Sequence, residues 1–144
     1  MLKRRLLALL PMLAAARPGQ ATTTRPERPL LVIRENDVKR DEPPPHGAIG
    51  MSTAYRISDA VPAPRQMEFR KRVLHVGAAI GLHPIGHDEV YYVVSGEGDV
   101  VSDGETRRMT AGTAAYLYEG AVVGIWQRGD KPLELIVSYP NPRP

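Results

Sequence analysis

The feature that most constrains the fold is a series of short apolar segments separated by turn residues. Runs rich in valine, isoleucine and tyrosine are typical of strands, and glycine, proline and aspartate are typical of the turns between them. No convincing helical pattern follows the first 21 residues, so the chain is predicted to be all-β, an antiparallel sandwich or barrel. The expected strands are 67–76, 78–83, 89–94, 99–102, 105–109, 114–118, 123–128 and 133–139.

Two connections between these segments carry clear turn chemistry. Asp103-Gly104 is a strong two-residue hairpin signal. Pro84-Ile85-Gly86 lies between segments 78–83 and 89–94, so we expect these two segments to form a hairpin as well. The tip of that hairpin would present four side chains that can bind a divalent metal or transfer a proton: His83, His87, Asp88 and Glu89.

Residues 1–21 have the pattern of a secretory signal peptide. A basic start, Lys3-Arg4-Arg5, precedes an apolar run over 6–16, and small residues follow. The run is too short to span a bilayer. We therefore expect cleavage and a periplasmic or secreted protein with no stable membrane insertion. The alternative is an uncleaved anchor.

The region before residue 67 is less regular. A strand is expected at 30–34 and another at 49–57, whereas 35–45 is charged and ends in three prolines. Because proline lacks the N–H that a strand ladder needs, we expect no regular structure over 35–45. The predicted organisation is a signal peptide over 1–21, an N-terminal extension and linker over 22–45, and a barrel domain over 46–140.

The basic character of the chain lies largely in its first 21 residues. The formal net charge is +3, and removal of the four basic and no acidic residues of 1–21 takes it to −1. This balance gives no reason to expect nucleic acid as a partner. Arg70-Lys71-Arg72 is interpreted as a solvated strand edge rather than a phosphate site.

The central stretch resembles the first motif of the cupin superfamily, G-x5-H-x-H-x3-E-x6-G. Gly77, His83, Glu89 and Gly96 match this motif in register, and Ile85 stands where the second histidine belongs. The second cupin motif, G-x5-P-x-G-x2-H-x3-N, is matched by two glycines and departs at three other positions. The matches are Gly112 and Gly120, and the departures are Tyr118 for proline, Val123 for histidine and Gln127 for asparagine.

The resemblance covers roughly residues 68–139 and implies a small single-domain cupin, a jelly-roll β-barrel with a degenerate metal-binding motif. Cupin metal sites use three histidines and one glutamate, of which only His83 and Glu89 remain here. His87, two residues from Glu89, is a candidate replacement. The resemblance thus leaves two cofactor states open: a divalent metal (Mn, Fe, Ni or Zn) held by His83, His87 and Glu89, or none. It also implies a homodimer, because N-terminal cupin strands often pair across a dimer.

Several functions are compatible with these residues. The first is an exported cupin that binds a small polar molecule, such as a sugar or sugar acid, with a weak or absent metal site. The alternative is a metal-dependent enzyme of the isomerase, epimerase or lyase type. Without metal, His83 is a candidate general base oriented by Glu89, with Tyr91 as the acid. A structural dimerisation module needs only the fold. The aromatic residues proposed for a sugar-binding mouth, or alternatively for the core, are Tyr116, Tyr118 and Trp126.

Overall fold

The computed structural model describes residues 27–141, and the fold belongs to the unit that begins at Leu31. The described residues contain ten strands and two short 3-10 helices, and they contain no α-helix. The first elements are η1 (Glu35–Val38), β1 (Lys39–Glu42), β2 (Ser52–Tyr55), η2 (Ile57–Ala60), β3 (Met67–Leu74) and β4 (Ala79–Pro84). The remaining elements are β5 (Glu89–Ser95), β6 (Glu97–Ser102), β7 (Glu105–Thr110), β8 (Ala114–Leu117), β9 (Val122–Arg128) and β10 (Leu133–Pro140).

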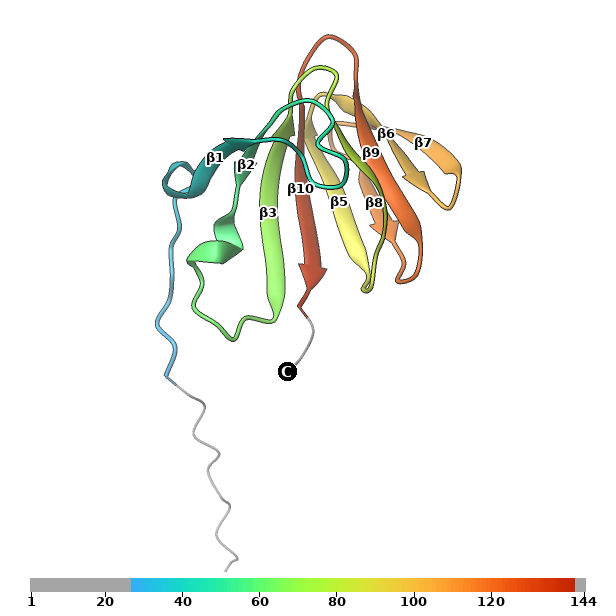
Figure 1. The fold of residues 1–144 in the computed structure, drawn as a ribbon. Coiled ribbons are helices and arrows are strands. Elements are labelled where there is room, and N and C mark those ends of the chain that lie inside the picture. The colour runs from blue at the N-terminus through green and yellow to red at the C-terminus, as the bar shows by residue number, and fades with distance from the viewer. Residues whose placement is uncertain (1–26, 142–144) are drawn as a thin grey trace, which may run out of the picture. The chain divides into compact units, whose positions relative to one another are not determined.

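The strands form two antiparallel sheets that face each other. One sheet has the order β1-β2-β3-β10-β5-β8 and the other has the order β4-β9-β6-β7. Figure 1 shows β3, β10 and β5 side by side, with β9, β6 and β7 in the other layer. This arrangement confirms the prediction of an all-β, antiparallel jelly roll.

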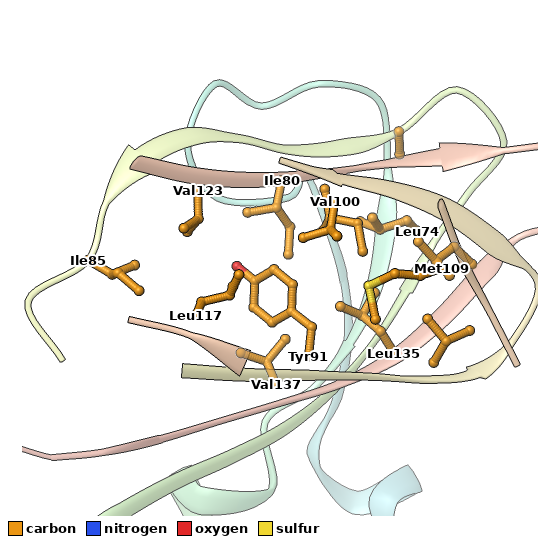
Figure 2. Close-up of a cluster of buried hydrophobic side chains, with 14 of the residues drawn as sticks. Leu74, Ile80, Ile85, Tyr91, Val100, Met109, Leu117, Val123, Leu135 and Val137 are labelled. Carbon is orange, nitrogen blue, oxygen red and sulfur yellow. The ribbon is translucent and has the colours of Figure 1, made fainter. Parts of the chain in front are cut away.

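The space between the sheets is filled by aliphatic side chains. Inward-facing residues of both sheets are fully buried, and the ring of Tyr91 lies among them (Figure 2). Burial of one such side chain stabilises the fold by about 1.5–3 kcal/mol. The largest aliphatic side chains of this core that are fully buried are Leu74, Ile125, Leu133 and Leu135.

The Asp103-Gly104 hairpin is confirmed. Both residues have positive φ, 48° and 83°, which is the geometry of a type I′ turn. Ser102 and Glu105 pair directly on either side of it. A type I′ turn has a backbone twist that matches the twist of its two strands, so this dipeptide sets the register of β6 and β7.

The predicted hairpin between 78–83 and 89–94 is wrong, although both strands exist. β4 pairs with β9 in one sheet, whereas β5 pairs with β10 and β8 in the other. The turn residues 84–86 therefore carry the chain from one sheet to the other. Turn residues in a sequence predict where the chain changes direction, but they do not predict which strand will pair with which.

The N-terminal predictions also needed correction. Residues 30–34 form no strand, because no neighbouring strand supplies them with hydrogen bonds. Region 35–45 does contain regular structure, the helix η1 and the strand β1. The three prolines affect only their own positions, and Lys39–Glu42 keeps the N–H groups that pair with β2. The strand expected at 49–57 shortens to β2.

Strand β3 is not a sheet edge. It lies between β2 and β10, so the interpretation of Arg70-Lys71-Arg72 as a solvated edge is wrong. Successive side chains of a strand point to opposite faces, which places Arg70 and Arg72 on the inner face and Lys71 on the outer one. Arg72 is only 7% exposed.

The expected signal peptide at 1–21 lies outside the described residues. Within the part of the chain that is described, no helix has the length and apolar character needed to cross a bilayer.

Candidate functional site

A cavity of about 150 Å³ opens between the two sheets at one end of the core. Three strands of the larger sheet supply one wall, with Arg70 of β3, Val137 of β10 and Tyr91 of β5 directly opposite one another. Strand β4 and the loop before β2 supply the other side. The remaining lining residues are Pro45, His46, Arg72, Ile80, His83, Glu89 and Tyr139.

Three of the lining residues are buried and titratable: Arg72, Glu89 and Tyr91. Charged side chains are almost never fully buried unless they are paired. A wider depression of about 440 Å³ beside Gly96 and Lys131 has no buried titratable lining residue. The smaller cavity is therefore the candidate functional site.

The two arginines of β3, Arg70 and Arg72, differ in how tightly hydrogen bonds hold their guanidinium groups. Arg72 donates from Nη1 to the Ser52 hydroxyl at 2.7 Å and from Nη2 to Glu42 at 3.1 Å. Arg70 donates to Glu68 at 3.2 Å and to Asp59 at 3.4 Å. Arg70 has no bond as short as the one from Arg72 to Ser52, and its side chain is 27% exposed against 8% for Arg72, so Arg70 is held more loosely.

Glu89 is the first residue of β5, and its side chain lines the cavity. Its side chain is 5% exposed, and its Oε2 atom is buried without a hydrogen-bond partner among the described residues. Burial raises the pKa of Glu89, and the positive charge of His87 only partly opposes this shift. The site thus contains a carboxyl group that holds its proton more tightly than glutamate ordinarily does.

Tyr91, two residues further along β5, faces the same side of the strand, as its position in sequence predicts. It is 1% exposed, and burial raises its pKa well above the ordinary value for tyrosine. Its hydroxyl therefore stays protonated at neutral pH and acts as a hydrogen-bonding group.

His83 is fixed in orientation by the backbone. Its Nδ1 atom lies 2.9 Å from the carbonyl oxygen of Gly81, and because a carbonyl only accepts, Nδ1 carries the proton. The other ring nitrogen, Nε2, is then an acceptor. Sequence reasoning paired His83 with Glu89, whereas the hydrogen bond found here is to Gly81.

His46 lies against His83 across the cavity entrance. The ring centroids are 3.6 Å apart and the planes are within 5° of parallel. A Cβ atom on Gly81 would lie 1.9 Å from the carbonyl oxygen of His46, so the loop can approach only because residue 81 is glycine. His46 and Ala48 have positive φ values of 61° and 50°, an uncommon conformation that is concentrated at functional sites.

The other two side chains predicted at the hairpin tip point elsewhere. His87 stacks on Tyr139 with centroids 4.3 Å apart. Asp88 accepts hydrogen bonds from the Tyr116 hydroxyl at 2.6 Å and from the Glu119 N–H at 2.9 Å. Asp88 therefore belongs to the surface, and His87 does not line the cavity but stacks on Tyr139 and acts electrostatically on Glu89, both of which line it.

These residues do not fit a metal ion. Ile85 and Val123, at the positions where the cupin motifs have histidine, are 5% and 0% exposed and belong to the core (Figure 2). Imidazole lone pairs lie in the ring plane, so the stacked rings of His46 and His83 cannot both be directed at one ion. Among the described residues no group of three or more histidine, cysteine, aspartate or glutamate side chains could hold a metal.

Sequence reasoning missed several lining residues and proposed others that lie outside. Arg70 and Arg72 were assigned to solvent, and His46 follows three prolines with no ligand-like spacing. The alternating direction of side chains along β3 was the available signal for the arginines, and none existed for His46. Tyr116 and Tyr118 are exposed and contact each other rather than the cavity, and Trp126 is half-buried away from it.

Comparison with known proteins agrees with this architecture. The family model described as Cupin domain matches residues 71–139. No curated protein matches the chain. Residues 71–139 therefore form a domain of the cupin superfamily.

Several solved structures share the fold. A predicted oxalate decarboxylase from Thermotoga maritima has a TM-score of 0.68 at 23% identity, covering 76% of this chain and 98% of its own. The polyketide cyclase RemF from Streptomyces resistomycificus has a TM-score of 0.67 at 17% identity, covering 80% and 82%. A sugar phosphate isomerase of the cupin superfamily from Silicibacter pomeroyi has a TM-score of 0.57 at 23% identity, covering 63% and 60%. At these identities the likeness shows the fold alone.

Proposed function

We propose that this chain is an exported cupin that binds a small polar molecule, such as a sugar or sugar acid, between its two sheets, without a tightly held metal. One observation carries the proposal: a cavity of about 150 Å³ contains the buried, unpartnered carboxyl oxygen of Glu89. An unsatisfied buried polar atom costs about 1–3 kcal/mol, and a bound ligand that donates a hydrogen bond would remove that cost. A cavity of this size encloses a molecule of roughly benzene's dimensions, so a small polar acid fits inside it and a sugar acid would extend from its mouth into solvent.

The direct test is a binding screen on the purified full chain, with a panel of neutral and acidic small molecules followed by thermal shift and by chemical shifts in NMR. Binding is expected to perturb residues of the cavity and to weaken at least tenfold in Glu89→Ala. The exposed Glu105 of β7, replaced by alanine, is the matched control and should bind as the wild type does. A screen in which no compound perturbs the cavity residues would contradict the proposal.

Metal analysis tests the other half of the proposal. We expect the purified protein to hold manganese, iron, nickel or zinc at well below one equivalent. A stoichiometric metal that is lost in His83→Ala would instead favour a metal-dependent enzyme.

Enzymatic turnover of the isomerase, epimerase or lyase type is the second candidate. The raised pKa of Glu89 and the free Nε2 acceptor of His83 favour it, because they place a proton donor and a base on one cavity. Two of the similar structures are a predicted oxalate decarboxylase and a sugar phosphate isomerase. Turnover of a bound compound that is abolished in Glu89→Gln would establish this candidate, and binding without turnover would exclude it for that compound.

Export and dimerisation are also proposed. Export to the periplasm or secretion rests on the pattern of residues 1–21, and fractionation of the expressed chain tests it. A homodimer is supported by exposed apolar side chains on the outer face of the larger sheet. These side chains are Met67, Phe69, Tyr92, Val94 and Tyr116. Sedimentation equilibrium should give twice the chain mass, and a monomer would contradict this assignment.

A further inference from the structure

The charges beside the cavity are unbalanced. A continuous network of ion pairs joins four arginines to three carboxylates, so it carries one positive charge in excess. Its members are Arg56, Arg65, Arg70, Arg72, Glu42, Asp59 and Glu68. Two of these arginines, Arg70 and Arg72, line the cavity. Part of the positive charge of this network therefore lies where a ligand would bind.

Two carboxylates of this network, Glu42 and Glu68, have pKa values below the ordinary value for glutamate. Although burial raises the pKa of Glu68, hydrogen bonds from Asn141, Arg65 and Arg70 lower it overall. Burial likewise opposes the lowered pKa of Glu42, which results from hydrogen bonds with Arg56 and Arg72. With its three carboxylates ionised, the network carries one positive charge in excess, and a monoanion would neutralise it.

The pairing register of β3, β10 and β5 sets the distance between the side chains that would contact a ligand. Arg70, Val137 and Tyr91 are direct neighbours on β3, β10 and β5. Strands lie about 4.8 Å apart, so the backbones of Arg70 and Tyr91 are separated by about 9.6 Å with Val137 between them. The wall is therefore cationic at one side, apolar in the middle and hydroxyl- and carboxyl-bearing at the other.

We propose that the cavity recognises a small hydroxy acid, whose carboxylate pairs with the loosely held guanidinium of Arg70 in the field of the fixed Arg72, and whose hydroxyl bonds to Glu89. This inference rests on the proposed function and names the ligand class of the same cavity. Guanidinium groups bind carboxylates through two parallel hydrogen bonds, which gives the recognition its direction. A carboxylate fits better than a phosphate monoester, because its single charge matches the single surplus charge of the network.

The test compares matched acid and neutral probes on the full chain by calorimetry. The pairs are glucuronate with glucose and lactate with propane-1,2-diol, and glucose 6-phosphate is the phosphate probe. Each acid should bind at least tenfold more tightly than its neutral partner. In Arg70→Gln the ratio should fall to about one, and Arg70→Lys, which keeps the charge but loses the planar fork, should be intermediate.

The matched control is Arg107→Gln, which removes a 76% exposed arginine on β7 outside this cavity and should keep the full ratio. Circular dichroism of Arg70→Gln is the check that this variant folds, which is expected because Glu68 keeps its bonds to Arg65 and Asn141. Equal binding of acids and neutral partners would overturn this inference and leave the proposed function standing. Tighter binding of glucose 6-phosphate than of glucuronate would also overturn it. Failure of every probe to bind would overturn both.

Discussion

The inner face of the larger sheet has two halves of opposite character on the same three strands. At the cavity end of β3, β10 and β5, the inward side chains are Glu68, Arg70, Tyr139, Val137, Glu89 and Tyr91. Toward the other end they are Leu74, Leu135, Leu133 and Val93, all fully buried. One half is therefore a conventional core, and the other half is a buried polar surface around a cavity.

The two halves are expected to serve different purposes: the apolar half stabilises the fold, and the polar half binds the ligand. Each buried aliphatic side chain contributes about 1.5–3 kcal/mol. Buried ion pairs contribute much less, because desolvation of the charges offsets their attraction. Substitutions in the apolar half should therefore act on the free energy of unfolding, and substitutions in the polar half mainly on ligand affinity.

The largest expected effect is in the apolar half. Leu135→Ala should lower the free energy of unfolding by about 2–5 kcal/mol, because it removes a fully buried side chain and leaves a cavity. Urea denaturation measures this change. The exposed Leu82→Ala is the control and should change stability by less than about 0.5 kcal/mol. A small effect at Leu135 would mean that the apolar half is not the main source of stability.

A smaller effect is expected at the boundary of the polar half. Arg72→Met keeps an apolar stem but removes the bonds to Ser52 and Glu42, and it should cost about 1–2 kcal/mol in urea denaturation. Glu42 keeps its bond to Arg56, which limits the loss. The control Arg107→Met should be nearly neutral. If Arg72→Met were more stable than the wild type, the buried arginine would be a net cost that is compensated only by ligand binding.

Glu89→Gln should change how the stability of the protein depends on pH, because it removes the buried carboxyl group of the polar half. A carboxyl group whose pKa is raised in the folded state loses its favourable contribution as pH rises above its ordinary value of 4.5. The glutamine variant lacks this loss, so its stability relative to the wild type should increase between pH 4.5 and pH 8. Thermal unfolding at several pH values measures the difference. A parallel pH dependence of the two proteins would show that Glu89 titrates normally.

The smallest effect is expected at the exposed rim. Burial and the charge of His83 both lower the pKa of His46, so the folded state should lose a little stability as pH falls through the ordinary histidine range. In an NMR titration the pKa of His46 should rise in His83→Ala and stay unchanged in His75→Ala, because His75 instead contacts Thr53. An unchanged value in His83→Ala would indicate that the two rings do not stack in solution.

Local sequence signals predicted the strands from residue 67 onward well. The Asp103-Gly104 turn specifies its own hairpin because both residues tolerate positive φ. The cupin motif positions showed that Ile85 and Val123 cannot bind a metal. The pairing of β4 with β9 could not be predicted in this way, because nothing in residues 79–84 indicates which of several strands will be the neighbour.

The cavity was predicted only in part. His83 and Glu89 were proposed from the motif and Tyr91 as a candidate acid on the same strand as Glu89, and all three line the cavity. Arg70 and Arg72 were not, because in sequence a run of three basic residues looks solvated. Their burial depends on carboxylates from β1, η2 and β3 itself, which are brought together only when the sheet forms.

By itself the sequence determined that the chain is built of strands, that its central part resembles the cupins, and that apolar residues replace half of the usual metal ligands. These properties follow from residue type and local spacing. Only the tertiary structure decided which polar groups face the cavity. In it Arg70 and Arg72 of β3 line the cavity, His46 stacks on His83, and one oxygen of Glu89 has no hydrogen-bond partner. The physical reason is that burial and charge pairing depend on neighbours distant in sequence, which no local pattern records.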